Sequence, residues 1–108
     1  MILKYSFNEF DNNLKSGKII VLDFYSNNCP TWVALNSILE EVDNIFYDKI
    51  IIFKVNAYEE LFLKNKFNVL STPKLYFIKN CKICGIHNGI ISKDALFNYI
   101  SDLLKKPF

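Results

Sequence analysis

The stretch Ser26-Asn27-Asn28-Cys29-Pro30-Thr31-Trp32 joins two segments of different character and decides how the rest of the chain can fold. Before it, residues 19–25 are mostly apolar and rich in β-branched side chains, the pattern of a buried strand. After it, apolar residues recur at helical spacing over residues 33–46. Cys29 therefore falls at the first turn of a helix, where unpaired backbone N–H groups and the helix dipole favour a thiolate over a thiol. Pro30 suits this helix start because its missing N–H costs no hydrogen bond there.

Length and composition predict one small domain over residues 1–108. Hydrophobic residues make up 51% and aromatic residues 16% of the chain, which is enough to build a core. The net charge is +2, without a basic block or a basic helix face, so we expect neither nucleic acid nor an anionic membrane as a partner. Residues 1–6 lack the apolar core of a signal peptide and no apolar run is long enough to span a membrane, which predicts a cytoplasmic protein. An odd number of cysteines in such a chain argues against a structural disulfide framework.

The periodicity of the remaining chain predicts alternating strands and helices. Strands are expected at residues 2–5, 18–25, 50–56, 74–79 and 83–88. Helices are expected from Ser6 to Ser16, from Pro30 to Phe46, from Glu59 to Lys66 and from Ser92 onward, with Ser6 and Ser92 as N-caps. The apolar stripe of the second helix is expected to consist of Leu35, Ile38, Leu39, Val42, Ile45 and Phe46. The order β-α-β-α-β-α-β-β-α predicts an α/β fold with one central mixed β-sheet of four or five strands, flanked by four helices.

With this order and spacing, the sequence resembles the thioredoxin family along nearly its whole length. Asp23-Phe24-Tyr25 fits the strand before the family's redox motif, and Cys29 falls on the attacking cysteine. Lys54 matches the lysine that faces a buried aspartate. Thr72-Pro73 matches the residue and cis-proline opposite the redox motif, and Gly89 matches a glycine after the last strand. The resemblance implies a thioredoxin fold, in which the catalytic candidates are Cys29, Asp23 and Lys54 and the substrate groove is lined by Tyr25, Trp32, Thr72, Pro73 and Gly89.

The redox stretch departs from the family pattern of two cysteines separated by two residues. Trp32 occupies the second cysteine's position, and Asn28 stands where a Trp is usual. A dithiol enzyme attacks a disulfide with its first thiolate and resolves the mixed disulfide with its second, tethered thiol, a step that Trp32 cannot perform. A strand from Pro73 to the next cysteine, Cys81, spans about 26 Å at roughly 3.3 Å per residue. That is too far for a disulfide with Cys29, which requires Cα atoms about 4.4–6.8 Å apart.

The loss of the second thiol leaves two interpretations open for Asp23. Its carboxyl group assists Cys29 or an incoming thiol through water, or it forms a buried ion pair with Lys54. In both cases we expect Asp23 to be buried, with Lys54 as its nearest charged neighbour and with a pKa raised by desolvation. Trp32 is interpreted either as a lid that packs on the groove or as a ring that stacks on a partner.

A second C-x-x-C pattern, Cys81-Lys82-Ile83-Cys84, falls in a predicted hairpin turn. This spacing resembles a zinc half-site, but it supplies two of the four ligands that a site requires. His87 follows three residues later, and regular strand alternation puts it on the face opposite Cys84. The pair is interpreted as two unrelated thiols, a local redox pair or a half-site shared between two protomers. We expect an exposed Cys81 and a partly covered Cys84, both far from the groove.

Functions of three classes fit these residues. In the first, a thioredoxin-like monothiol forms mixed disulfides through Cys29 with cysteine-containing proteins or a small thiol. Thr72 and Pro73 align the partner as a short strand, and an external thiol or a reductase completes turnover. In the second, a redox-inactive adaptor module binds a peptide in the same groove around Trp32 and Pro73. The third is a metal-bridged dimer built on the distal cysteines. We expect no cofactor, and a monomer or weak dimer.

Overall fold

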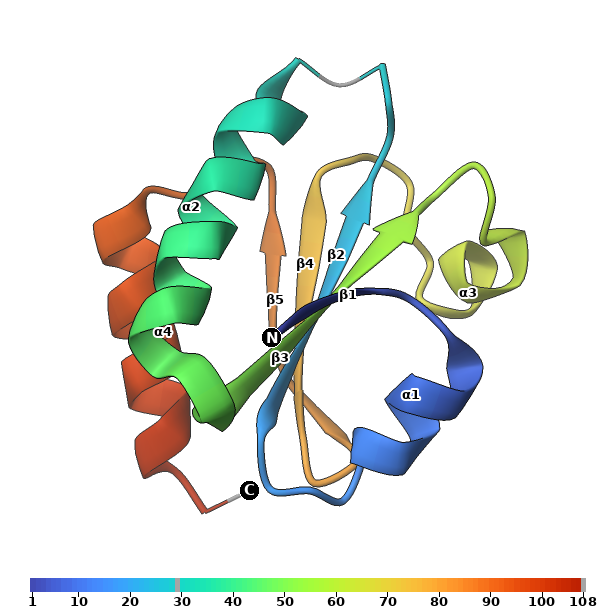
Figure 1. Ribbon diagram of the computed structural model, residues 1–108. Helices are drawn as coiled ribbons and strands as arrows, with labels where there is room; N and C mark the ends of the chain where they lie inside the picture. Colours follow the sequence, from blue (N-terminus) through green and yellow to red (C-terminus); the bar gives the residue numbers. More distant parts are fainter. Residues whose placement is uncertain (29, 108) are drawn as a thin grey trace.

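The computed structural model describes residues 1–28 and 30–107 and has the predicted α/β architecture (Figure 1). Five strands form one mixed sheet in the order β1-β3-β2-β4-β5. The strands are β1 (Ile2–Lys4), β2 (Ile19–Tyr25), β3 (Ile50–Asn56), β4 (Lys74–Lys79) and β5 (Lys82–Asn88). The helices are α1 (Phe7–Asn13), α2 (Thr31–Phe46), α3 (Leu61–Lys66) and α4 (Lys93–Lys105), with a 3₁₀ turn, η1, at Tyr47–Lys49. The predicted element order is therefore confirmed.

Strand β2 lies at the centre of the sheet. It pairs in parallel with β3, where Asp23 is opposite Lys54, and antiparallel with β4, where Asp23 is opposite Leu75. The side chains from Ile19 to Phe24 are all buried, because helices cover both faces of the sheet. This double coverage explains why β2 and β3 read as continuous apolar runs rather than as alternating patterns.

Alternation along β2 separates two hydrophobic cores, one on each face of the sheet. Ile19 and Val21 belong to the core beneath α2 and α4, whereas Ile20, Leu22 and Phe24 belong to the core on the other face. Figure 1 shows α2 and α4 together on one side of the sheet and α1 and α3 on the other. Because side chains alternate between faces, Asp23 and Tyr25 lie on the same face as Val21, beneath α2.

The starts of α1 and α4 follow local capping as predicted, whereas three other expectations for the helices are wrong. Helix α1 ends at Asn13, before the expected Ser16. Ser6 and Ser92 accept hydrogen bonds from backbone N–H groups three residues later, at 3.2 Å each. Helix α3 begins at Leu61, later than expected, because a turn in which the Asn56 carbonyl accepts two backbone N–H groups precedes it. The prediction that Ile45 belongs to the buried stripe of α2 is wrong, since Ile45 is 51% exposed.

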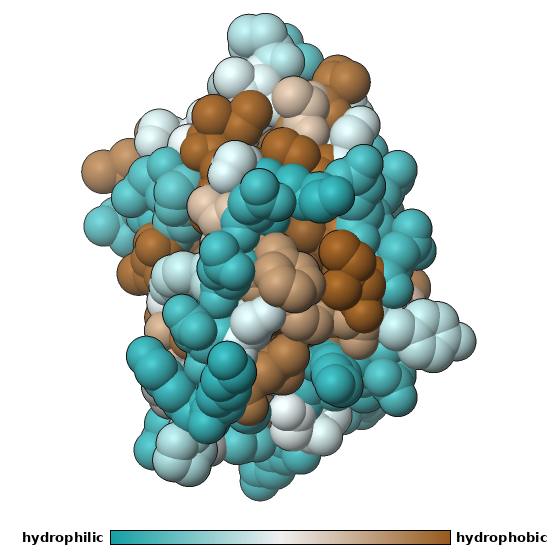
Figure 2. All heavy atoms as spheres, turned by 90° about the vertical axis from the view of Figure 1, so that its left-hand side faces the viewer, coloured by the Kyte–Doolittle hydropathy of each residue, from teal (hydrophilic) through white to brown (hydrophobic). Residues whose placement is uncertain are grey.

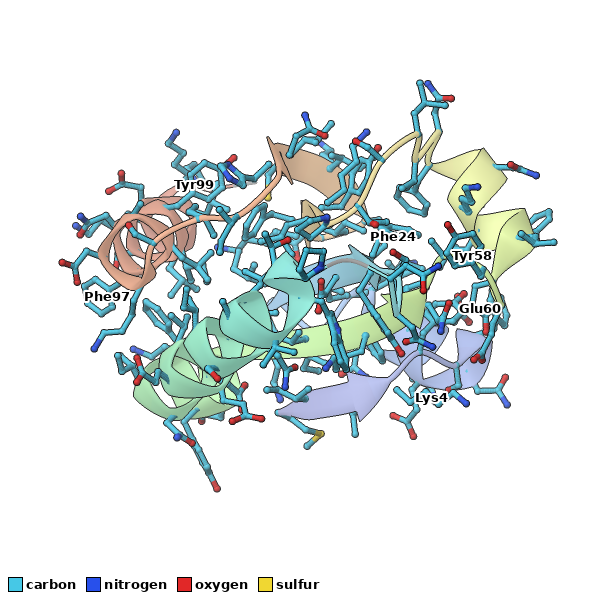
Figure 3. All side chains as sticks on the ribbon, turned by 90° about the horizontal axis from the view of Figure 1, so that it is seen from above. Lys4, Phe24, Tyr58, Glu60, Phe97 and Tyr99 are labelled. Atoms are coloured by element: carbon cyan, nitrogen blue, oxygen red, sulfur yellow. The ribbon has the colours of Figure 1, made fainter. Side chains whose placement is uncertain are left out.

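The outer surface of the α2 and α4 layer is mixed in character. Figure 2 shows brown apolar patches there, interrupted by hydrophilic side chains. Phe97 of α4 stacks on Phe46 of α2 with ring centroids 5.2 Å apart. Tyr99 lies on a different side of α4 (Figure 3) and packs against Phe77 of the sheet. Across residues 1–28 and 30–107, the structure contains no helix with both the length and the apolar character needed to cross a membrane.

Candidate functional site

The candidate site lies at the edge of the sheet where β2 and β3 end, β4 begins and α2 starts (Figure 1). Cys29 belongs to this stretch of the sequence but lies outside the described residues, so its assignment remains a prediction. The other predicted site residues are described, and they form two groups at this edge. Asp23, Tyr25, Trp32 and Lys54 make the first group, and Thr72, Pro73 and Gly89 make the second.

Asp23 is completely buried, as predicted. Neither carboxyl oxygen has a hydrogen-bond partner within the described part of the chain. Burial raises the pKa of the Asp23 carboxyl to about 6, and the positive charge of Lys54 offsets only part of that effect. An unpaired carboxyl group in an apolar core costs stability.

Of the two interpretations left open for Asp23, the buried ion pair with Lys54 is not found in the structure. The two residues are opposite each other in the register of β2 and β3, yet the described residues contain no salt bridge between them. The Lys54 ammonium instead donates a hydrogen bond to the side-chain carbonyl of Asn36 on α2. It also lies 5.4 Å and 4.9 Å from the ring centroids of Tyr25 and Trp32. These cation–π contacts and the amide together replace the carboxylate as the partner of the lysine.

Trp32 packs on residues of this same group. Its ring stacks on Tyr25 with a centroid distance of 5.2 Å and an interplanar angle of 19°. The indole Nε1–H is buried and has no acceptor among the described residues. Trp32 therefore does pack as a cover, over Tyr25 and Lys54 at the ends of β2 and β3.

The second group surrounds the loop that leads into β4. The Thr72–Pro73 peptide bond is cis, the geometry that the resemblance implies. The Thr72 hydroxyl lies 3.0 Å from the hydroxyl of Ser26, which directly follows β2. The Pro73 carbonyl accepts a hydrogen bond of 2.9 Å from the Gly89 N–H, and Gly89 has a φ of +82°, which favours glycine. Thr72, Pro73 and Gly89 thus lie together as predicted.

Two residues at this site were missed from the sequence. Asn36 follows Trp32 by four residues, and this helical spacing puts both side chains on one face of α2. That spacing was the available signal for Asn36 as a partner of Lys54. Ser26 carries a hydroxyl directly after a buried strand and is itself only 7% exposed. Its partner, Thr72, is distant in sequence, so no local pattern could reveal the contact.

The distal cysteines lie on opposite faces of the sheet. The Cys81 thiol is exposed and donates to the Leu14 carbonyl at 3.6 Å, on the side of α1. The Cys84 thiol is half-buried, donates to the Phe77 carbonyl at 3.3 Å and packs against the core beneath α4. Burial raises the pKa of Cys84. The expected exposures are confirmed, but the two thiols do not face each other.

The prediction that His87 and Cys84 lie on opposite faces of β5 is wrong. A register shift between Phe77 and Ile78 interrupts the alternation of β5. Both residues consequently lie on the α4 face of the sheet. Within residues 1–28 and 30–107, no group of three or more His, Cys, Asp or Glu side chains could hold a metal ion. A metal site on the distal cysteines therefore has no third ligand within the described chain.

Comparison with known proteins agrees with this geometry. A family model described as Thioredoxin matches residues 1–102. The chain belongs to the thioredoxin family. A thioredoxin from Haemophilus influenzae is 30% identical over 82 residues, which are 76% of this chain and 77% of that protein. The chloroplastic thioredoxin Y of Oryza sativa is 29% identical over 103 residues, which cover 94% of this chain and 61% of the rice protein. The chain thus spans about three fifths of the length of that relative.

The fold is shared with thioredoxins of known structure. A mutant thioredoxin from Halobacterium salinarum superposes with a TM-score of 0.85, at 18% identity, over 98% of this chain and 92% of that protein. In this thioredoxin-family chain, the ring of Trp32, three residues after Cys29 in the sequence, is engaged by Tyr25 and Lys54. Cys81 and Cys84 lie at the hairpin between β4 and β5, whereas Pro73 directly precedes the other end of β4.

Proposed function

We propose that this protein is a thioredoxin-like thiol–disulfide exchange protein that acts as a monothiol through Cys29. The observation that carries the proposal is the packing of Trp32, at the position of the resolving cysteine, against Tyr25 and Lys54. A side chain engaged in this way supplies no second thiol. Cys81 and Cys84 follow β4 at its far end, and the extended strand separates them from the loop at Pro73.

The proposed reaction consists of two exchange steps. The Cys29 thiolate attacks one sulfur of a partner disulfide, so that a Cys29–partner disulfide forms and the other sulfur leaves as a thiolate. An external thiol, either a small thiol or a cysteine of a reductase, then loses its proton and attacks the partner sulfur of this mixed disulfide. The Cys29 thiolate is released, and the external thiol remains bonded to the partner. Each step breaks one S–S bond and forms another, and the external thiols supply the electrons.

Asp23 is proposed as the group that exchanges protons with these thiols through water. A carboxyl group with a pKa of about 6 is mostly ionised at neutral pH, yet it is more basic than an exposed aspartate. Its two oxygens are unpaired and buried, so they remain available for a water molecule. Thr72 and Pro73, which border the same edge of the sheet, are proposed to align the partner as an added strand.

A comparison of two substitutions at Trp32 tests the monothiol mechanism. Trp32→Cys restores a tethered thiol, whereas Trp32→Ser removes the ring without adding one. We expect weak insulin reduction by the natural protein and by Trp32→Ser, with dithiothreitol or a thioredoxin reductase as the electron donor. Trp32→Cys should raise the rate by orders of magnitude, because a tethered thiol has a very high effective concentration. The monothiol mechanism would be contradicted if the natural protein reduced insulin as fast as Trp32→Cys does.

The reactivity of Cys29 separates exchange chemistry from binding alone. Alkylation rates are measured against pH in a chain in which Cys81 and Cys84 are replaced by Ser. We expect an apparent pKa for Cys29 below about 8.5, the reference value for a free thiol. Glutathione disulfide should then form a one-to-one mixed disulfide that Cys29→Ser abolishes. An apparent pKa at or above the reference value would leave only the redox-inactive binding module.

A further inference from the structure

A small pocket opens next to Thr72, on the side of α3. Its volume is about 100 Å³, and its polar lining comes from Ser26, Tyr58, Lys64, Ser71 and Thr72. Since one water molecule occupies about 30 Å³ in the liquid, the pocket has room for about three waters. It therefore has room for a short polar side chain.

Lys64 is the one charged residue that lines this pocket in the described chain. Its ammonium group forms no ion pair or hydrogen bond with any other described residue. The other polar residues that line the pocket, Ser26, Tyr58, Ser71 and Thr72, carry hydroxyl groups, a type of group that can donate a hydrogen bond to an anion. An ammonium group among hydroxyl donors is suited to a carboxylate, because charge-assisted hydrogen bonds are the stronger ones.

No carboxylate of the described chain forms an ion pair with Lys64. Glu59 accepts a hydrogen bond of 3.3 Å from the Asn56 side chain. Glu60 leaves the loop on the side of β1 and Lys4, whereas Tyr58 lies on the other side of that loop (Figure 3). Burial and, to a lesser extent, the negative charge of Glu60 raise the pKa of Tyr5, so this carboxylate acts on the residue that follows β1. Lys64 is therefore the one source of formal charge in the described lining of the pocket.

The rim of the pocket is apolar and open to solvent. Leu70 is 87% exposed and Tyr58 is 64% exposed, although both line the pocket. Exposed apolar side chains beside a polar cavity are typical of a surface that receives another chain. Because Thr72 belongs both to this pocket and to the loop proposed to align the partner, a group bound here would lie close to the exchanging disulfide.

We propose that this pocket is a subsite for a carboxylate carried by the disulfide partner. Lys64 and the hydroxyl groups hold the carboxylate, and the adjacent part of the partner rests on Leu70 and Tyr58. The inference rests on the proposed function and adds to it the chemical class of the substrate, an acidic disulfide. The carboxylate belongs either to an acidic residue of a partner protein or to a small thiol such as glutathione.

A matched pair of small disulfides tests the subsite in a chain with Cys81 and Cys84 replaced by Ser. 3,3′-Dithiodipropionate carries carboxylates, and bis(2-hydroxyethyl) disulfide is neutral. We expect Lys64→Gln to lower the rate of Cys29 modification by the anionic reagent about fivefold, and to leave the neutral rate within about twofold. Lys64→Arg should keep most of the anionic rate. Lys66→Gln, which removes an exposed charge from the same helix, is the matched control.

The outcomes of this comparison separate the subsite from the chemistry. The subsite would be overturned if Lys64→Gln and Lys66→Gln lowered the rate of Cys29 modification equally, or if Lys64→Gln lowered it equally with both reagents. The exchange function would remain intact in either case. If neither reagent modifies Cys29, the proposed function fails. The subsite is then decided by NMR titration of the Cys29→Ser chain with 3,3′-dithiodipropionate. Shifts at Lys64 and Ser71 that disappear in Lys64→Gln support the subsite, and no shifts overturn it.

A second arm distinguishes the two sources of the carboxylate. Glutathione disulfide is compared with peptide disulfides that carry Glu or Gln next to the cysteine. If Lys64→Gln lowers the rate of Cys29 modification with glutathione disulfide alone, the partner is a small acidic thiol. A loss confined to the Glu peptide identifies an acidic protein segment. No loss with either reagent would overturn the subsite.

Discussion

Replacement of Asp23 by Asn should stabilise the protein at neutral and alkaline pH. The carboxyl group is completely buried, and neither oxygen has a hydrogen-bond partner within the described residues. Its folded-state pKa of about 6 lies about 2 pH units above the ordinary value of 3.8. At about 1.4 kcal/mol per pH unit, the ionised carboxylate lowers the free energy of unfolding by about 3 kcal/mol. Asn has nearly the same shape and carries no charge, so the substitution removes this penalty.

The pH dependence follows from proton linkage. Between about pH 4 and about pH 6, the folded state binds more protons at Asp23 than the unfolded state does. The free energy of unfolding therefore decreases as the pH rises through this window, and the loss is complete above it. The difference between Asp23→Asn and the natural protein should be small near pH 4. It should grow to about 3 kcal/mol by about pH 8.

Urea unfolding under reducing conditions, followed by circular dichroism, measures this difference at several pH values. Asp102→Asn is the matched control, because Asp102 is an exposed carboxylate on α4. We expect the control to track the natural protein at every pH. If Asp23→Asn gives no larger gain at about pH 8 than at about pH 4, then Asp23 is paired or solvated and the account of its burial is wrong.

Three further predictions concern other parts of the fold. Trp32→Ala should lower the free energy of unfolding by about 2 kcal/mol, because it removes the ring stack and the cation–π contact, and Trp32→Phe should lower it by less. Urea unfolding measures both values, and an equal decrease in the two variants would contradict a contribution from the stacked indole. Gly85→Ala should lower the free energy of unfolding by about 1–3 kcal/mol, because a Cβ there would lie 2.0 Å from the Tyr99 hydroxyl. Adding Tyr99→Phe to the same chain should restore part of this stability, and a double variant no more stable than Gly85→Ala would argue against the contact. Iodoacetamide should modify the exposed Cys81 faster than the half-buried Cys84 in the native protein, as read by mass spectrometry, with the rates converging on unfolding.

Much of the fold could be predicted because its signals are local. Continuous apolar runs indicate that β2 and β3 are covered on both faces. Ser6 and Ser92 indicate helix starts, because an N-cap side chain bonds a backbone N–H only three residues later in the sequence. Asp23 was recognisable as a buried acid because it interrupts such a run. Burial in a central strand is sufficient to raise a carboxyl pKa, whichever side chains surround it.

The partners of the site residues depended on tertiary structure. Lys54 is opposite Asp23 in the strand register, but its long, flexible side chain can reach several groups. The positions of Asn36, Tyr25 and Trp32 decide which groups the Lys54 ammonium contacts.

The sequence by itself determined the order of strands and helices and the central position of Asp23, and it puts Trp32 three residues after Cys29. Tertiary structure alone decided that Cys84 and His87 lie on the same face of the sheet, because one shifted residue in β5 reverses the side on which the following side chains lie. It also decided the pocket at Lys64, which brings Ser26, Tyr58 and Thr72 together from distant parts of the chain. Local patterns report burial and periodicity, whereas contacts between distant residues depend on how the packed elements meet.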